Sequence, residues 1–480
     1  MYIDSLRGGY SMSNGTDGGI RIEYGVDEKP PLPKSILLGL QHVAVMIVPA
    51  TAVAYVVANG VGAEADAAYL VQMVLLFSGL ATMVQAYTVG PVGARLPIVM
   101  GSSFTFVGAT IDIGASFGLA AVFGAILVTG FVVEGLIGWQ FKRIKPFFPP
   151  LVTGLVVVII GLYLVPVAMD YAAGGVGASD FGALHHIGLA ALVLAIAVGL
   201  NMFTRGVTRL LSVLFAIIVG YVTAIALTFA TGLELVDFSD VGSAAWVALP
   251  SPTRFGFEFE PIAIATFAVL FLVSSMETVG DMSGVTAAEG RNPTNEEFRG
   301  GLFNDGLLSS IGAVFSAFPI TSFSQNVGIV NFTGVMSRHV VGIGGVFLAV
   351  LGLSPKVGAA VTTIPSAVFG GAVLLMAGMV AASGFRLVVT HVDLDRRNTV
   401  IVAVSLGLGL GVATTPEALS GLPSGAELFF GQSVIVTALS ALVLNTFVPG
   451  AASPLFDAPA TDSEPASEAI DAEPAGSVDD

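Results

Sequence analysis

The chain has no cysteine among its 480 residues, and it carries few charges. Without cysteine there is no disulfide framework, no thiolate metal site and no cysteine nucleophile. Only 11% of the residues are charged, whereas soluble domains carry roughly 25%. Hydrophobic residues make up 54%, and the mean hydropathy is +0.88. This composition excludes a soluble globular domain and predicts an all-α polytopic membrane protein.

The motifs of several enzyme classes are missing as well. The five histidines are scattered and show neither the HExxH pattern nor the paired spacing of a zinc site. The run GLGLG at 406–410 lies in an apolar stretch without a following lysine, so it is not a phosphate-binding loop. There is no Gly-x-Ser-x-Gly elbow and no basic stripe for nucleic acid. We expect neither an enzyme nor an ATP-driven pump, and no cofactor, metal or nucleic-acid partner.

Long apolar runs fill most of the chain, which has room for about 14 transmembrane segments of roughly 20 residues. The predicted segments are 35–58, 67–89, 97–114, 119–139, 150–169, 184–203, 209–230, 260–280, 302–318, 322–335, 339–353, 360–382, 398–413 and 430–449. With the N-terminus inside, 16 of the 18 lysines and arginines fall on the inner side, and only Arg254 and Lys356 fall outside. This asymmetry obeys the positive-inside rule and predicts that both termini of a cell-membrane protein are cytoplasmic.

The two ends differ in composition from the apolar region. Residues 1–33 are polar and glycine-rich, without the apolar core of a signal peptide, and are interpreted as a cytoplasmic leader. Residues 451–480 contain eight acids and no base, which predicts an acidic disordered tail. The transporter-like unit is expected to occupy residues 34–450.

The segment from Pro319 to Gly334, PITSFSQNVGIVNFTG, is polar although it lies in a long apolar region. Irregular polar backbone is tolerated in a bilayer only where protein or a cavity surrounds it, and such a segment marks the binding site of many transporters. The third segment begins with the stretch from Leu96 to Thr110, which shares a Pro-Ile pair and a serine five residues after the proline. Seven segments separate the two, so they point in opposite directions. We therefore predict a 7+7 inverted repeat with broken segments 3 and 10.

Carboxylates inside the spans are the strongest candidates for function, because charges are rare there. Glu277 and Asp281 are four residues apart and share one helix face. Two buried carboxylates repel each other, so the pair is either a proton carrier or a cation site. The alternative is that Asp281 lies at a solvated helix end. Asp305, in the next segment, either stabilises the binding segment or joins the ion path. The alternative is an acid near a loop that reaches water or pairs with Arg299.

Four uncharged or weakly basic residues complete the candidate set. The amide of Gln325 can both donate and accept hydrogen bonds to the edge of a planar ligand, and Asn326 is expected to brace the loop. Both amides could instead join neighbouring helices. Phe104 lies in the broken third segment, where its ring can stack on a flat heterocycle. His42 either relays protons or is a packing histidine. Glu134 and Asp112 are interpreted as interfacial, without a role.

Several stretches together resemble the nucleobase–ascorbate transporter family, the xanthine/uracil permeases. Residues Gln325 to Gly334 match its pattern Q-N-x-G-x-x-x-x-T-G. Four further stretches occur in the family's order, namely GLQHVAVM around His42, LPIVMGSSFTFVG around Phe104, the pair Glu277-x-x-x-Asp281, and RGGLFNDGL around Asp305. The resemblance covers roughly residues 30–450.

The resemblance implies a fold of 14 spans with short strands in segments 3 and 10. It implies a core domain from 34–140 and 258–353 that moves against a gate domain from 148–232 and 358–450, with the gate forming a homodimer. It implies that Glu277 and Gln325 hydrogen-bond a nucleobase, that Phe104 stacks on it, and that backbone near Ser103 and Ser324 contributes. Support or ion-coupling positions would be Asp281, Asp305, His42 and Asn326.

The implied activity is import of a nucleobase across the lipid bilayer by cation symport. Uracil-type members usually carry an acid in place of Gln325 and a histidine in place of Asp281, so the chain is more similar to the xanthine and uric acid branch. An amide at Gln325 also tolerates an anionic ligand such as urate, which a carboxylate would repel. Uracil or another base remains an alternative, as does a sulfate- or bicarbonate-type anion transporter of the same fold. The coupling cation is either H⁺ or Na⁺.

Overall fold

The computed structural model describes residues 22–140 and 149–449, and nearly all of the regular structure in these ranges is helical. The predicted tail 451–480 and residues 1–21 of the predicted leader lie outside the described residues. The remaining part of the leader runs beside residues 334–338, where the Glu23 amide donates to the carbonyl of Gly334 at 2.8 Å.

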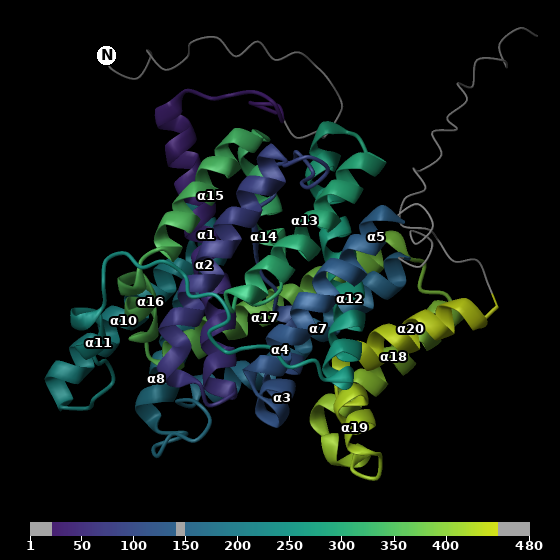
Figure 1. Ribbon diagram of the computed structural model, residues 1–480. Helices are drawn as coiled ribbons and strands as arrows, with labels where there is room; N and C mark the ends of the chain where they lie inside the picture. Colours follow the sequence, from purple (N-terminus) through teal and green to yellow (C-terminus); the bar gives the residue numbers. More distant parts are fainter. Residues whose placement is uncertain (1–21, 141–148, 450–480) are drawn as a thin grey trace, which may run out of the picture.

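Within the described residues, the first half of the chain contains one strand among mostly apolar helices (Figure 1). The elements are α1 (Leu32–Gly60), η2 (Glu64–Asp66), α2 (Ala67–Tyr87), β1 (Met100–Ser102), η3 (Phe104–Phe106), α3 (Val107–Phe117), α4 (Leu119–Thr129), η4 (Gly130–Glu134), α5 (Gly135–Trp139), α7 (Pro150–Ala172), α8 (Leu184–Phe203), α9 (Val207–Leu210), α10 (Ser212–Thr231) and α11 (Ser239–Ser243).

The second half repeats this order with a strand at the same place. Its elements are α12 (Pro261–Thr286), η6 (Ala287–Glu289), α13 (Asn295–Val314), β2 (Ile320–Ser322), α14 (Ser324–Thr333), α15 (Arg338–Gly352), α16 (Pro355–Thr362), α17 (Ser366–His391), α18 (Arg396–Thr414), η7 (Pro416–Leu419), α19 (Ser424–Phe430) and α20 (Ser433–Phe447). In both halves a short strand is followed by a short helix, as predicted for broken segments 3 and 10.

Nine helices of the described chain are long and apolar enough to cross a membrane, or eleven if two bent pairs each count as one span. Three of the predicted segments fall outside that set. Segment 3 contains only β1, η3 and the short helix α3, segment 10 contains β2 and α14, and segment 9 is the more polar helix α13. With these three segments the fourteen expected are accounted for, so the predicted fold class is confirmed.

Some predicted boundaries were wrong. The twelfth segment was placed at 360–382, but α17 extends from Ser366 to His391 and is preceded by the separate helix α16. Pro365 lies directly before α17, and its own backbone is extended rather than helical. The eighth segment was placed at 260–280, but α12 continues to Thr286. This extension brings Asp281 inside the helix.

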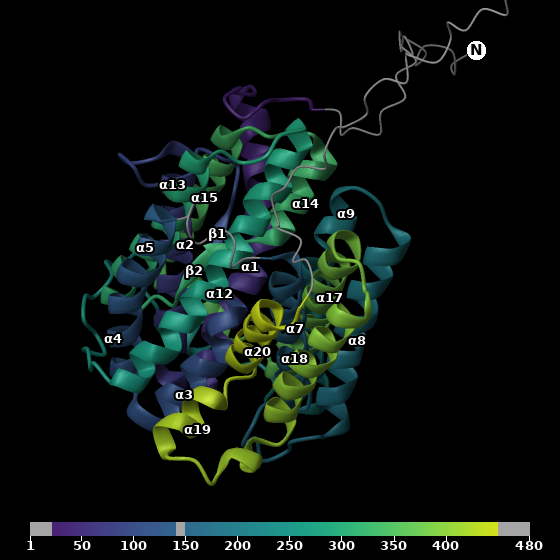
Figure 2. The same cartoon turned by 90° about the vertical axis from the view of Figure 1, so that its right-hand side faces the viewer.

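The two strands pair with each other in the middle of the molecule (Figure 2). They are antiparallel, with Met100 opposite Ser322 and Ser102 opposite Ile320. Antiparallel pairing of two equivalent segments is what an inverted repeat produces. The pairing also gives the backbone groups of two broken spans hydrogen-bond partners that lipid cannot supply.

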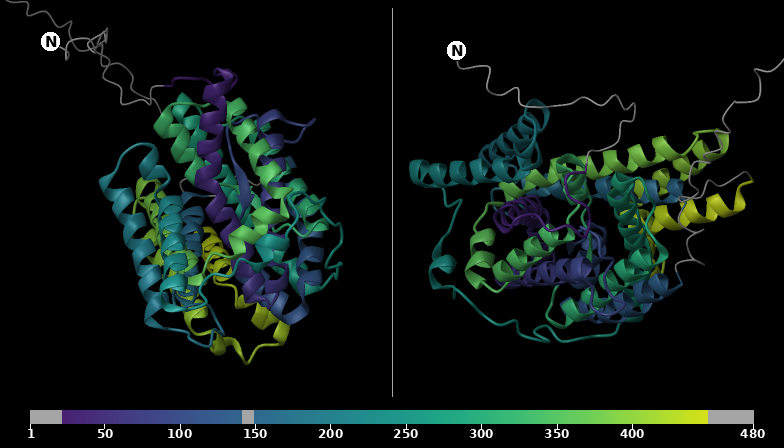
Figure 3. Two further views of the ribbon diagram at one scale, coloured as in Figure 1. Left: turned by 90° about the vertical axis from the view of Figure 1, so that its left-hand side faces the viewer. Right: turned by 90° about the horizontal axis from the view of Figure 1, so that it is seen from above.

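The helices form two groups that lie side by side in Figure 2. In one group α15 packs along α1 and α2, and α13 packs against α4 and α5. In the other, α17 packs along α7 and α8, and α18 packs along α20 and α7. Helices α8 and α10 are largely exposed along the outer edge of the second group (Figure 3, left). The connection 232–260 passes round the outside from one group to the other (Figure 3, right).

Small residues allow the helices to approach closely within each group. A Cβ atom added to Gly79 of α2 would lie 2.3 Å from the backbone nitrogen of Ala349 in α15. A Cβ atom added to Gly161 of α7 would lie 2.3 Å from the backbone nitrogen of Ala381 in α17. Close backbone contact of this kind is the usual basis of helix association in membranes, where lipid removes the hydrophobic driving force.

Candidate functional site

The two broken segments meet where β1 leads into η3 and β2 leads into α14. The Ser103 amide donates to the carbonyl of Pro319 at 3.1 Å, and the Phe323 amide donates to that of Val99 at 3.0 Å. The Ser103 hydroxyl accepts from the Thr105 amide at 3.2 Å and so caps η3. The N-terminal ends of two short helices therefore come together inside the molecule. Backbone N–H groups at the N-terminal end of a helix can donate to a polar solute.

Helix α12 presents the two predicted carboxylates to this junction. Glu277 is half-buried, and its Oε2 lies 3.4 Å from the Thr105 hydroxyl. Asp281 is only 7% exposed, and its two oxygens accept hydrogen bonds of 2.6 Å from Ser322 and Ser324. Asp281 is thus held by the second broken segment and does not lie at a solvated helix end.

Gln325 and Phe104 differ in their surroundings. Gln325 lies in the first turn of α14 and lines a cavity of about 740 Å³ between the two helix groups. Phe104 is partly buried and packs against the apolar core, and neither it nor Glu277 is part of the cavity wall. Ser324 precedes Gln325 and turns its hydroxyl toward Asp281. The structure therefore brings Ser103, Ser324, Glu277 and Asp281 into one hydrogen-bonded neighbourhood, with Gln325 facing the adjoining cavity.

The predicted supporting residues are all buried. Asn326 Nδ2 lies 3.1 Å from His42 Nδ1 and donates to the His42 carbonyl at 3.3 Å, which ties α14 to α1. Asp305 is 0% exposed and accepts a hydrogen bond from Thr278 of α12. No ion pair joins Asp305 to Arg299 within the described residues. The surface alternative for Asp305 was wrong. The contact of Asn326 joins α14 to α1, as the alternative for the two amides expected, and its role as a brace of the loop stays a prediction.

One sequence interpretation has to be corrected. Glu134 was interpreted as interfacial, but it is 0% exposed and its Oε1 accepts a hydrogen bond of 3.2 Å from Ser275 of α12. The sequence signal was hidden because Glu134 lies near the end of an apolar run, where a carboxylate usually reaches water. In the structure this residue ends the π-helical turn η4, which packs against α13.

The cavity beside Gln325 has a basic wall that sequence reasoning did not identify. Three arginines line it, namely Arg205, Arg209 and Arg386, and no aspartate or glutamate of the described residues does. All three are exposed, and no carboxylate of the described residues forms an ion pair with them. In the sequence, each is recognisable only as one of the 16 lysines and arginines on the inner side of the membrane. Their convergence on one cavity depends on packing between α8, α9 and α17, which distant positions in the sequence do not reveal.

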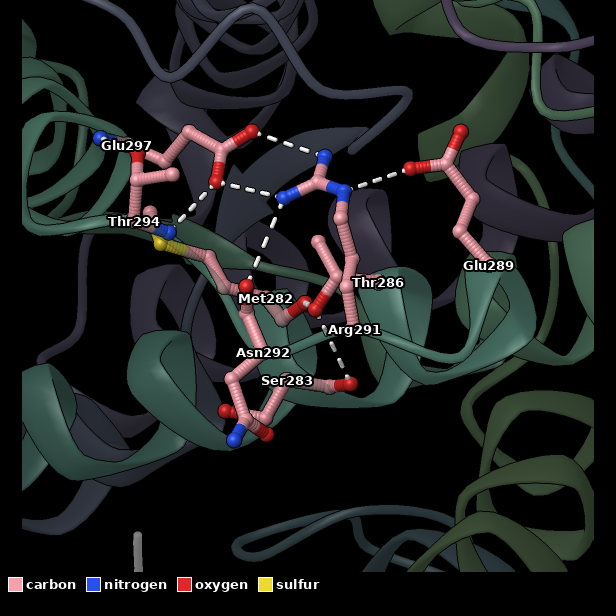
Figure 4. Close-up of polar contacts among 8 residues, drawn as sticks. All are labelled: Met282, Ser283, Thr286, Glu289, Arg291, Asn292, Thr294 and Glu297. Carbon is pink, nitrogen blue, oxygen red and sulfur yellow. Dashed lines mark hydrogen bonds and ion pairs between the residues drawn. The ribbon is translucent and has the colours of Figure 1, made fainter. Parts of the chain in front are cut away.

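The connection between α12 and α13 is fixed by an arginine at one end of the site helix (Figure 4). Arg291 donates to Glu289 at 2.7 Å and to both carboxylate oxygens of Glu297 at 2.8 and 2.9 Å. Glu297 also caps α13 together with Thr294. Partial burial raises the pKa of Glu297, but hydrogen bonds from Arg291 outweigh this and leave the pKa below its usual range. The turn thus orients α12, which carries Glu277 and Asp281.

A separate cluster lies in the connection between α7 and α8. Asp180 Oδ2 lies 3.0 Å from His185 Nε2 and 2.9 Å from His186 Nε2, and these atoms are close enough to hold a metal ion. The hydrogen bond with His186 lowers the pKa of Asp180. Because the cluster sits at the opposite end of α8 from Arg205, it is not part of the cavity described above.

At the C-terminal end of α1, side-chain contacts join the two helix groups. Tyr55 stacks on Phe369 of α17 with ring centroids 4.7 Å apart, and its hydroxyl lies 3.1 Å from that of Ser366. The Tyr171 hydroxyl of α7 donates to the carbonyl of Val56 at 3.0 Å. We call the contact of Tyr55, Tyr171, Ser366 and Phe369 the aromatic seal. Along α1, the cavity is lined by Ala44, Val45 and Pro49, and Tyr55 of the aromatic seal lies further toward the C-terminal end of the helix.

Comparisons with known proteins agree with this architecture. The model of the family described as Permease family, Xan_ur_permease, matches residues 33–418. The xanthine permease of Bacillus subtilis is 39% identical over 86% of this chain and 93% of its own length. The uric acid permease PucK of Bacillus subtilis is 38% identical over 86% of this chain and 95% of its own length. The xanthine permease XanQ of Escherichia coli is 32% identical over 92% and 96%.

Solved structures with the same fold are more distant in sequence. The transmembrane domain of the cyanobacterial bicarbonate transporter BicA aligns with a TM-score of 0.55 at 14% identity, over 86% of this chain and 97% of that domain. The murine anion transporter Slc26a9 in its inward-facing state aligns with a TM-score of 0.58 at 12% identity, over 88% and 69%. These likenesses concern the fold alone.

Proposed function

The chain belongs to the permease family whose model matches it, and from this premise we propose that it imports an oxidised purine, xanthine or uric acid, by cation symport. Its family is one of transporters rather than enzymes. The observation that carries the proposal is the junction of two broken membrane segments, where serine hydroxyls, helix N-termini and the carboxylates of Glu277 and Asp281 converge. A planar base offers N–H donors to carboxylates and carbonyl acceptors to backbone N–H groups.

In this proposal Glu277 and Gln325 hydrogen-bond the base, Phe104 stacks on it, and the backbone near Ser103 and Ser324 contributes donors. The half-burial of Glu277 and the position of Gln325 beside a cavity support these roles. Asp281 and Asp305 serve ion coupling. His42 and Asn326 hold the binding helix α14 in place through their mutual contact.

The basic cavity wall favours an oxidised purine over uracil. Arginines without acidic neighbours attract an anion, and urate is anionic at neutral pH. The relatives at 38% and 39% identity are named as uric acid and xanthine permeases. Transport of uracil or another nucleobase is the alternative within the same family. A sulfate- or bicarbonate-type anion transporter is a further alternative by fold, but such an ion has no N–H donor that the carboxylate of Glu277 could accept.

Transport proceeds by movement of a core domain, 34–140 and 258–353, against a gate domain, 148–232 and 358–450. Two features that lie between the proposed domains support this division. The cavity is bounded by α1 and α14 on one side and by α8, α10 and α17 on the other. The aromatic seal likewise joins α1 to α7 and α17. Breaking the seal while closing the cavity would expose the site to the other side of the membrane.

The remaining assignments follow from charge and exposure. The coupling cation is H⁺, with Na⁺ as the alternative. The excess of lysine and arginine on the side of the cavity supports a cell-membrane protein with both termini in the cytoplasm. The largely exposed apolar helices α8, α10 and α18 leave the gate free to bind lipid or a second copy of the chain, which supports a homodimer.

A binding experiment on the purified protein tests the site. Labelled xanthine and urate should bind the wild type, and Gln325→Glu should weaken urate more than xanthine, because it places a carboxylate against an anion. Gln432→Glu is the matched control, since Gln432 bonds Asp112 and does not line the cavity. Equal binding of both purines by wild type and Gln325→Glu would contradict the assigned role of Gln325. Absence of any purine binding by folded wild type would contradict the function.

A further inference from the structure

A second pair of carboxyl groups lies in the core, away from the cavity. Glu134 ends the π-helical turn η4, Asp305 lies in the middle of α13, and both are 0% exposed. One oxygen of each, Oε2 of Glu134 and Oδ1 of Asp305, has no hydrogen-bond partner among the described residues. The other oxygens accept from Ser275 and Thr278 of α12. Two buried, unsatisfied acceptors in one neighbourhood require an explanation.

Two glycines bring η4 onto α13 at this point. A Cβ atom added to Gly306 would lie 2.3 Å from the carbonyl oxygen of Gly130 and 3.0 Å from the Cβ atom of Glu134. Asp305 is the neighbour of Gly306, and the negative charges of Glu134 and Asp305 would repel each other. π-helical turns occur frequently at functional sites. The π-helical turn η4 places the carboxyl group of Glu134 against α13 and keeps this group buried.

No cation balances the pair. Glu277 and Asp281 are the other charged groups that act on Asp305, and both are acidic. No lysine, arginine or histidine of the described residues forms an ion pair with Glu134 or Asp305. Two buried carboxylates without a counter-ion are very costly. Protonation of one carboxyl group removes one of the two charges and turns that group into a hydrogen-bond donor.

Hydroxyl groups connect this pair with Asp281 at the junction of the two broken segments, which we call the solute site. The Thr278 hydroxyl donates to Asp305 and lies 3.4 Å from the Ser322 hydroxyl. Ser322 in turn donates to Asp281 at 2.6 Å. A row of side chains from α12 and β2 therefore leads from the buried pair to the carboxylate beside the binding helix. Hydroxyl groups can both accept and donate, which is what a proton relay requires.

We propose that Glu134 and Asp305 share one exchangeable proton, and that the hydroxyls of Thr278 and Ser322 link this pair to Asp281 at the solute site. The inference rests on the proposed function and deepens it, because it gives the coupling proton a place. The proton leaves a carboxyl oxygen of the pair, each hydroxyl accepts one hydrogen while passing on its own, and Asp281 receives the proton beside the binding helix α14. The pair is left as two carboxylates, and nothing is oxidised or reduced.

The test compares net uptake with exchange in proteoliposomes containing the full chain. A gradient of about one pH unit, worth about 1.4 kcal/mol, concentrates a 1:1 symported solute about tenfold. In Glu134→Gln an uncharged amide with its own N–H donors replaces one carboxyl group, so no proton is needed to remove the second charge. We expect accumulation of labelled xanthine to fall from about tenfold to about one, while exchange of labelled for unlabelled xanthine stays within about twofold. The uptake should also lose its dependence on pH.

Two further variants keep the test decisive. Thr278→Val removes the relay hydroxyl at similar volume and should slow proton-driven uptake while sparing exchange, even if Glu134→Gln does not fold. Asp112→Asn is the matched control, because it also converts a carboxyl in a membrane helix but bonds only Gln432.

Three results would overturn the inference. The first is an unchanged accumulation ratio and pH profile in Glu134→Gln. The second is an equal loss of exchange and uptake in both variants, which indicates a purely structural role. The third is wild-type accumulation driven by a Na⁺ gradient alone, which would leave the purine substrate in place. Failure of the wild type to exchange any purine would instead refute the proposed function, on which the inference rests.

Discussion

Neutralising the three arginines of the cavity should weaken urate selectively. The change is Arg205→Gln, Arg209→Gln and Arg386→Gln in one variant. A sphere of the cavity's 740 Å³ is about 11 Å across, so a wall charge acts on a central solute over about 6 Å. In water each charge then contributes about 0.7 kcal/mol, and three contribute about 2 kcal/mol. Physiological salt screens this to about 1 kcal/mol, or about fivefold in Kd.

The assay is equilibrium binding of labelled urate and of neutral guanine to the purified protein at low and high salt. Urate should bind the triple variant about fivefold more weakly at physiological salt, and guanine should change less than about twofold. High salt should reduce the preference of the wild type for urate. Arg396→Gln is the control, because Arg396 is exposed at the start of α18 and does not line the cavity. A parallel loss for both purines, or none for either, would refute the electrostatic reasoning.

Other predictions follow from the seal and from the turn between α12 and α13. Tyr171→Phe with Ser366→Ala removes two hydrogen bonds of the seal, together about 2 kcal/mol. Loss of these bonds should favour the state in which the seal is open and the cavity is closed. Because the chain has no native cysteine, a single Met379→Cys in the cavity wall can report this change in population. A membrane-impermeant maleimide should then label it more slowly from the cavity side, and an unchanged rate would contradict the prediction. Arg291→Gln should cost about 1 kcal/mol of stability, since solvent partly screens its pair with Glu297, and a thermal melt in detergent measures this. Because the pKa of Glu297 is lowered, the contribution is complete at neutral pH and is lost as the pH falls below about 4, so the melting temperatures of wild type and Arg291→Gln should converge in acid.

Features that depend on local pattern were predictable from the sequence. Long apolar runs mark most of the spans, and the glycine, proline and polar residues of segments 3 and 10 mark the broken ones. The spacing of Glu277 and Asp281 places them on one face of a helix whatever the tertiary structure. Pairing of β1 with β2 follows from the inverted repeat, because equivalent segments run in opposite directions across the molecule.

Features that depend on packing between distant segments were not predictable. Glu134 lies near the end of an apolar run, and only the π-helical turn and its contact with α13 bury it beside Asp305. Arg205 and Arg386 are 181 positions apart and share a cavity wall because α8 and α17 pack together. The contact between His42 and Asn326 likewise joins α1 to α14. A single sequence carries no signal for any of these pairings.

The central claim is that this permease moves an oxidised purine through the junction of its two broken segments. Uptake of radiolabelled xanthine into proteoliposomes tests it most directly, with unlabelled urate, guanine, uracil and sulfate as competitors and with pH and Na⁺ gradients imposed separately. The account predicts saturable uptake that urate blocks, that sulfate does not affect and that a pH gradient drives. Uptake that only uracil inhibits would leave the family assignment intact but make uracil the substrate. No nucleobase uptake by folded, inserted protein, or inhibition by sulfate, would contradict the account.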